Sequence, residues 1–157
     1  MIQRIQSIWL LIATVCGILF LFLPLAEFAN VAQTEYAKLY AENLIVFPKE
    51  LVTKSSFYTY PLFIGGLIIA ILSLITIFLY KKRKLQMRLT SINVLISIVV
   101  LALTFFLYTD SFAKDFAMNI NYQAGIFMPI IALVCLIMAY RGINRDEKLI
   151  RAADRIR

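Results

Sequence analysis

Residues 60–84 read YPLFIGGLIIAILSLITIFLYKKRK, an apolar stretch that carries no charge until it meets four consecutive cations. At about 1.5 Å per residue, a helix over 60–80 spans the roughly 30 Å hydrocarbon core of a membrane. The cations mark the point where the chain returns to water. Three further apolar runs complete the predicted spans, at 8–28, 91–108 and 122–140. The sequence therefore predicts an all-α membrane protein, a four-transmembrane-helix antiparallel bundle that forms one domain over 1–157.

The composition agrees with a membrane protein and disfavours several kinds of chemistry. Hydrophobic residues make up 62% of the chain and charged residues 16%, and the mean hydropathy is +0.84. There are no histidines, five glycines and two cysteines. Histidine catalysis, a glycine-rich phosphate loop and a disulfide scaffold are therefore disfavoured. We predict no catalytic residue, no cofactor and no metal site, because Cys16, Glu27 and Asp110 belong to different depths of the membrane.

The first apolar run has an alternative reading as a cleaved signal peptide, since it lies at the N-terminus. Its apolar region is longer than a signal peptide requires, and no small-x-small pattern precedes Ala26, Ala29 or Ala32. The pattern favours a membrane span.

The distribution of Lys and Arg predicts the orientation of the spans. With a cytoplasmic N-terminus, twelve of the sixteen basic residues fall in the inner segments and four in the outer ones. This bias predicts that both termini are cytoplasmic. Anionic lipid headgroups are the expected partners of the inner charges, and nucleic acid is not. The predicted contacts to headgroups or to a partner are Lys81, Lys82, Arg83, Lys84, Arg88, Arg151 and Arg155.

Small and polar residues recur on one face of each predicted span. Helices in lipid associate through close packing and a few hydrogen bonds, so these faces should point into the bundle. The predicted packing residues are Gly17, Gly66, Ala70, Ser73, Asn93, Ser97 and Ala132. A pore or substrate path is the alternative, but no span carries a charge at its centre, where transport paths place one.

The segments outside the spans carry weaker signals. In the outer segment 29–59, we predict a helix within 31–43 and a short strand pair from 44–47 and 51–52. A single turn of helix is expected within 109–121. The tail 141–157 predicts an amphipathic cytoplasmic helix capped by Asn144, lying on the membrane or against the basic turn, with docking on a partner protein as the alternative.

Six short motifs are distributed over the chain: MIQRIQ at 1–6, FLPLA at 22–26, YPLF at 60–63, YKKRKLQMRL at 80–89, RGINRDEKLI at 141–150 and ADR at 153–155. Together they resemble an uncharacterised family of small integral membrane proteins from Bacteroidota, a domain of unknown function. The resemblance implies a four-helix protein of the bacterial inner membrane, and it supplies no activity.

Small-residue faces without catalytic groups favour a non-enzymatic accessory or structural subunit of a larger membrane complex. Its expected partners are membrane lipid and other integral membrane subunits. The alternative is a small transporter or channel, expected to be a homo-oligomer because four helices are few for a carrier built from inverted repeats.

Overall fold

The computed structural model describes residues 3–29, 36–47, 59–80, 82–109 and 119–155, and for residues 3, 4, 36, 46, 47, 151 and 153–155 the backbone alone. The described elements are α1 (Gln3–Phe22), β1 (Ala26–Ala29), β2 (Tyr36–Leu39), β3 (Leu44–Phe47), α2 (Tyr60–Phe78), α3 (Arg83–Ala102), the π-helix η2 (Leu103–Thr109), β4 (Asn119–Tyr122), the 3₁₀-helix η3 (Ala124–Phe127) and α5 (Met128–Arg155).

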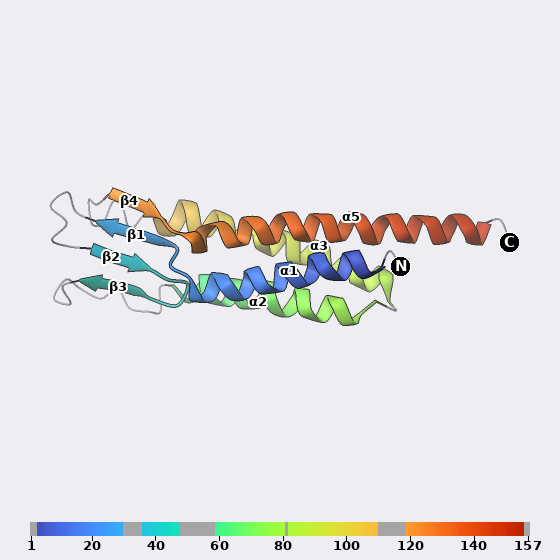
Figure 1. Cartoon of the computed structure of the whole chain (residues 1–157), viewed down its shortest axis with the longest axis horizontal. Helices are drawn as coiled ribbons and strands as arrows, with labels where there is room; N and C mark the ends of the chain where they lie inside the picture. The colour runs from blue at the N-terminus through green and yellow to red at the C-terminus, as the bar shows by residue number, and fades with distance from the viewer. Residues whose placement is uncertain (1–2, 30–35, 48–58, 81, 110–118, 156–157) are drawn as a thin grey trace.

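Four long helices run side by side and form an elongated bundle with the chain termini at one end (Figure 1). Helix α1 packs on α2 and α5, and α3 packs on the same two helices from the other side. Successive helices are antiparallel. All four are long and apolar enough to cross a membrane, which confirms the helical part of the prediction.

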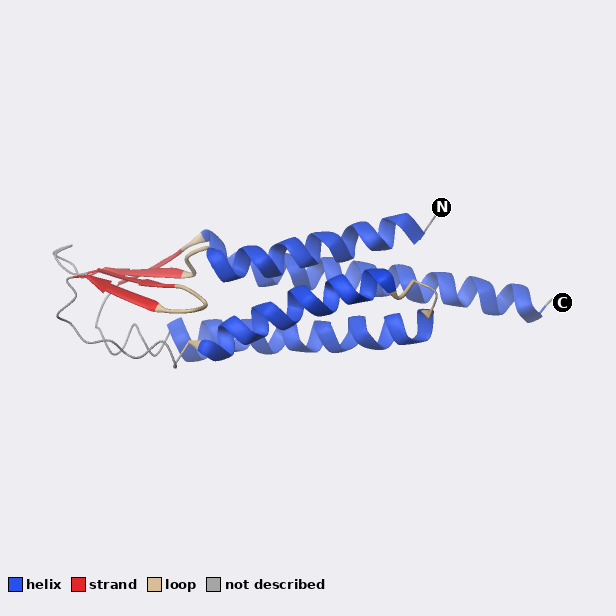
Figure 2. Cartoon of the chain, turned by 90° about the horizontal axis from the view of Figure 1, so that it is seen from below, coloured by secondary structure: helices blue, strands red, loops and turns tan. Residues whose placement is uncertain are grey.

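A four-stranded antiparallel sheet stands at the end of the bundle opposite the termini (Figure 2). Its order is β3-β2-β1-β4, with Glu27 of β1 opposite Lys38 of β2 and Asn121 of β4. The chain is therefore mostly helical but not all-α, contrary to the prediction. In β1, Phe28 is buried against the core while the neighbouring Glu27 is half-exposed, the alternation expected of a sheet with one wet face.

The sheet shortens two predicted spans. The first was expected to reach Phe28, but α1 ends at Phe22, and β1 follows Pro24. Proline lacks an N–H and favours an extended residue before it, so the chain leaves the helix there. The fourth span was expected to start at Tyr122, which instead ends β4, and α5 starts six residues later at Met128 with Pro129 in its first turn.

Other predictions of local structure also need correction. The helix expected within 31–43 is wrong where the chain is described, because 36–39 forms β2 and pairs with β1. The strand at 44–47 is confirmed as β3, but it pairs with β2, and residues 51–52 lie outside the described part. Most of the turn of helix expected within 109–121 also lies outside it, and 119–121 belong to β4. Sheet pairing outweighs the weak helical spacing of Tyr36, Leu39 and Tyr40.

The basic segment and the tail are both more helical than predicted. Helix α3 starts at Arg83, so Arg83, Lys84 and Arg88 stand on a helix rather than in a turn. Helix α5 runs unbroken from Met128 to Arg155, so Asn144 lies in its interior and caps nothing. Ile143 is buried in the bundle, because α5 continues to pack there.

Candidate functional site

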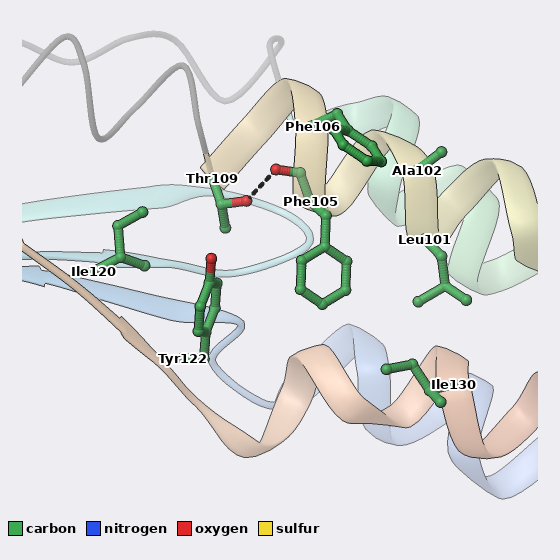
Figure 3. A pocket seen from close by; sticks show the side chains of 8 residues that line it. All are labelled: Leu101, Ala102, Phe105, Phe106, Thr109, Ile120, Tyr122 and Ile130. Carbon is green, nitrogen blue, oxygen red and sulfur yellow. Dashed lines mark hydrogen bonds between the residues drawn. The ribbon is translucent and has the colours of Figure 1, made fainter.

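A lateral groove opens where the sheet-side ends of α3 and α5 separate (Figure 3). It has a volume of about 780 Å³, within the range of small-molecule sites. One wall comes from α3 and η2, and the other from β4 and α5. The lining side chains are Leu101, Ala102, Phe105, Phe106, Thr109, Ile120, Tyr122 and Ile130.

The π-helix η2 shapes the first wall. The Thr109 hydroxyl donates to the carbonyl oxygen of Thr104 at 2.9 Å and to that of Phe105 at 2.6 Å. The first of these bonds spans five residues, the period of a π-helix, and holds the wider turn in place. A π-turn inserted at a helix end redirects the side chains beyond it and is frequent at functional sites.

Two aromatic rings face each other across the groove. Phe105 of η2 and Tyr122 of β4 lie with ring centroids 5.9 Å apart and ring planes at 50°, a favourable tilted geometry. In Figure 3 the Tyr122 hydroxyl points toward Thr109 at the end of the groove nearest the sheet. Phe106 is 79% exposed and turns away from the bundle. The groove therefore has an aromatic middle and a polar end next to the sheet.

The polar residues predicted to pack do so between α2 and α3. The Asn93 amide nitrogen donates to the Ser73 hydroxyl at 2.8 Å and to the Ile69 carbonyl at 3.2 Å. Ser97 donates to the Asn93 carbonyl one turn back on its own helix. All three polar side chains are fully buried. The Asn93 side-chain oxygen has no hydrogen-bond partner among the described residues.

The predicted small residues lie at close helix contacts. A Cβ added to Gly17 of α1 would stand 3.0 Å from the backbone nitrogen of Ala70 on α2. One added to Gly66 would meet Phe20 at 2.7 Å, so these glycines permit the approach of α1 and α2. Ala132 is fully buried.

Two further glycines lie at close contacts, and of these the sequence reasoning missed Gly65. Gly65 touches Val100 of α3, and Gly125 lies against the Pro24 carbonyl at the joint between bundle and sheet. The adjacent glycines Gly65 and Gly66 could have indicated the Gly65 contact. Neighbouring residues point to different sides of a helix, so the pair lets two other helices approach.

The basic residues gather at the end of the bundle that carries the termini. Lys82, Arg83 and Lys84 line an open cavity of about 440 Å³ between the start of α3 and Glu147 of α5. Nearby, Gln6 of α1 donates to the Asp146 carboxylate at 2.5 Å inside the bundle.

The remaining predicted basic residues are not brought to that cavity. Arg88 is exposed one turn further along α3. Lys81 lies outside the described residues, as do the side chains of Arg151 and Arg155.

The described residues offer little to a metal. None of them forms a group of three or more cysteine, aspartate or glutamate side chains placed to hold an ion. Cys16 and Cys135 are both buried and free.

Comparison with known proteins gives a family match over nearly the whole chain. A family model described as "Domain of unknown function (DUF4293)" matches residues 2–156. No curated protein and no solved structure matches the chain.

Proposed function

Because the chain belongs to the DUF4293 family, a domain of unknown function, we propose a role from the structure: a non-enzymatic, multi-pass inner-membrane protein that serves as an accessory subunit of a larger complex. In this role the bundle lies in the membrane, and the sheet stands outside the cytoplasm and meets a partner. The bacterial origin rests on the sequence resemblance alone.

The outer surface of the bundle supports membrane insertion. Large apolar side chains are exposed along all four helices, among them Leu11, Leu74, Leu95 and Val134. Water would penalise such a continuous apolar surface, whereas lipid accommodates it.

The charged end of the bundle supports cytoplasmic termini. Lys82, Arg83, Lys84 and Arg88 lie at the end that carries both termini, and the sheet lies at the other (Figure 1). Positive residues beside spans stay in the cytoplasm, so the sheet faces outward. The same cations lie where anionic headgroups would meet them, at about 1 kcal/mol for each Lys or Arg.

The observation that carries the accessory role is the fastening of the sheet to three helices. The Leu25 amide after α1 donates to Leu39 of β2 at 2.7 Å. Thr59, just before α2, donates through its hydroxyl to the Glu42 carbonyl at 2.5 Å. Gly125 of η3, which leads into α5, donates to the Pro24 carbonyl at 3.0 Å. A sheet held this firmly is a fixed platform rather than a loose loop.

The platform ends in an edge strand suited to a protein partner. Within the described part of the chain, β4 pairs with β1 on one side and with no strand on the other. Unpaired edge groups can accept a strand of another protein, which gives affinity through main-chain hydrogen bonds.

The transporter alternative is less well supported. A solute path would need deep polar residues such as Asn93 and Ser97, and both already donate hydrogen bonds within the bundle. The Asn93 bonds to α2 and the Ser97 bond within α3 account for both residues without a solute.

Photo-crosslinking in native membranes tests the accessory role. A photoreactive amino acid replaces Asn121, an exposed residue of β4, and in a matched control it replaces Ile98, which is exposed on the lipid-facing side of α3. We expect a discrete adduct with a second protein at position 121 and none at 98. Only unlinked chain, or adducts between copies of this chain, at both positions would refute the role.

A topology assay separates failure of that role from failure of membrane insertion. Two variants are made in a chain with Cys16→Ala and Cys135→Ala, one with Asn121→Cys and one with Lys84→Cys. Intact spheroplasts, which expose the outer face of the inner membrane, are then treated with a membrane-impermeant maleimide. We expect rapid labelling at 121 and protection at 84 until the membrane is lysed. The reverse pattern would overturn the proposed orientation.

A further inference from the structure

We propose that the groove between η2 and α5 holds one acyl chain of an outer-leaflet phospholipid, with the glycerol ester end at Thr109 and Tyr122. The proposal rests on the membrane insertion and orientation above, but not on the accessory role. It assigns a ligand class to a site that the sequence did not indicate.

The length of the groove selects an acyl chain over a partner helix. Along α3 and η2 the lining runs from Leu101 to Thr109, which is about 12 Å at a helical rise of about 1.5 Å per residue. A membrane-spanning partner helix would cross the whole core of about 30 Å, of which this groove covers less than half, the depth of one leaflet. Helices α3 and α5 contact each other. A separate, smaller cavity of about 220 Å³ lies between them further along, lined by Ser91, Val94, Ile137 and Tyr140. The groove therefore matches the hydrocarbon region of one leaflet.

The polarity of the lining follows the polarity of a lipid. The inner end is purely aliphatic, formed by Leu101, Ala102 and Ile130. The end next to the sheet presents the Tyr122 hydroxyl beside Thr109, whose own buried hydroxyl is already bonded to backbone carbonyls (Figure 3). Tyrosine concentrates at headgroup depth because its ring is apolar and its hydroxyl is polar. From there the Tyr122 hydroxyl can donate to an ester carbonyl while the chain descends along Phe105.

The groove opens sideways, toward the bilayer. Phe106, at 79% exposed, and Ala102, which is also exposed, lie at its mouth. An acyl chain can enter directly from the leaflet, without passing through water. An empty groove of this size would leave its walls without dispersion contacts, so a lipid chain is the occupant that the surroundings supply.

The groove is also preformed, which distinguishes a binding site from ordinary lipid contact. The Thr109 hydroxyl fixes the π-turn, and β4 is held in place by its pairing with β1. An acyl chain that enters meets walls already in position. Its binding therefore costs less conformational entropy of the protein, and it is retained longer than annular lipid.

The test measures retained phospholipid by native mass spectrometry of protein purified in mild detergent. Ala102→Trp fills the groove from α3. The matched control is Ile98→Trp, one helical turn away on the same exposed face but outside the lining. We expect one phospholipid on the wild type and on the control, and about a tenfold loss of it in Ala102→Trp, equivalent to about 1.4 kcal/mol.

A second variant protects the test against misfolding. Ile130→Trp fills the groove from the α5 wall and should give the same loss, while thermal unfolding in detergent should match the wild type for at least one of the two. Equal lipid retention by the wild type and a folded groove variant would overturn the proposal.

Photoreactive fatty acid incorporated into vesicle phospholipid locates the chain. At equal protein density in the vesicles, we expect strong labelling of Phe105 and Ile130 and weaker labelling of Ile98. Uniform labelling of exposed apolar positions would mean annular lipid only and would overturn the proposal. So would protection of the groove by a second copy, by a partner protein or by another segment of this chain, each revealed by a protein crosslink from a photoreactive residue at position 105.

Discussion

Substitution of Gly125 by alanine should loosen the joint between the bundle and the sheet. Gly125 lies in η3, where its amide donates to the Pro24 carbonyl at 3.0 Å. An added Cβ would stand 2.5 Å from that carbonyl oxygen and 2.8 Å from the oxygen of Leu23. Both neighbours are backbone atoms, so neither can rotate away, and the two segments must separate.

The expected cost follows from that geometry. An ordinary contact begins at 3.4 Å, so the segments must part by about 0.9 Å, the difference from 2.5 Å. Such a shift breaks the 3.0 Å hydrogen bond, at about 1 kcal/mol, and overpacking adds about 1–3 kcal/mol. The change from glycine to alanine also stabilises the folded state by about 0.4–1 kcal/mol, because alanine lowers the conformational entropy of the unfolded chain. The net loss in the free energy of unfolding is about 2 kcal/mol.

Unfolding by SDS in mixed micelles measures this loss, with the fluorescence of Trp9, the one tryptophan, as the signal. Gly142→Ala is the comparison variant: a Cβ there would stand 2.9 Å from Cγ of Gln6, a side chain that can shift by a few tenths of an ångström and keep its bond to Asp146, whereas the backbone at Pro24 cannot rotate away. It also gains helix propensity, so its stability should stay within about 1 kcal/mol of the wild type. If Gly125→Ala proved as stable as Gly142→Ala, the close joint at Pro24 would be refuted.

Three further predictions concern polar contacts, each measured by the same unfolding assay. Asn93→Leu loses two hydrogen bonds but also removes the unpartnered buried oxygen, so stability should change by less than about 1 kcal/mol; a loss above about 2 would contradict this account. Gln6→Leu leaves the buried carboxylate of Asp146 without this donor and should cost about 1–3 kcal/mol, and the double variant with Asp146→Leu should recover part of it; additive losses would argue against the pairing. The 2.6 Å pair of Lys38 and Glu27 is partly exposed, so a double-mutant cycle should give at most about 1 kcal/mol, falling with salt; a salt-independent coupling would exclude simple ion pairing.

The helical part of the fold was predictable because each span carries its own signal. The run that became α2 is apolar over its whole length and ends on cations, so length and hydropathy suffice to find it. The burial of Asn93 and Ser97 could also be anticipated, since a polar group inside a span needs a partner within the bundle.

The sheet could not be predicted in the same way. Each strand has four residues, too few for a period of two to stand out. Strand β4 comes from a segment some ninety positions beyond β1, and only the bundle brings the two together. Two local hints were present: the apolar run 44–47, which was correctly predicted as a strand, and Pro24, which lies inside the predicted span 8–28 and instead follows the end of α1.

The groove left almost no trace in the sequence. Leu101, Phe105 and Ile130 are apolar residues that would face lipid equally well on a straight helix. What turns them into a wall is the π-turn, whose only signal is the pair Thr104 and Thr109 at a spacing of five. Threonine hydroxyls bond to backbone carbonyls in many membrane helices, so this spacing by itself is too common to identify a site.

The groove and the edge of the sheet share one strand, so they cannot change independently. Tyr122 pairs with Ala26 in β1 and also faces Phe105 across the groove. A protein strand added to the free edge of β4 would hold Tyr122 in place, whereas a displacement of β4 would change the distance between the two rings. Under the two proposals above, binding at the edge and retention of an acyl chain would be linked through Tyr122, and by reciprocity each would alter the affinity for the other by the same factor. A smaller side chain at this position, as in Tyr122→Ala, would remove the ring that couples them while leaving the main-chain pairing of β4 available.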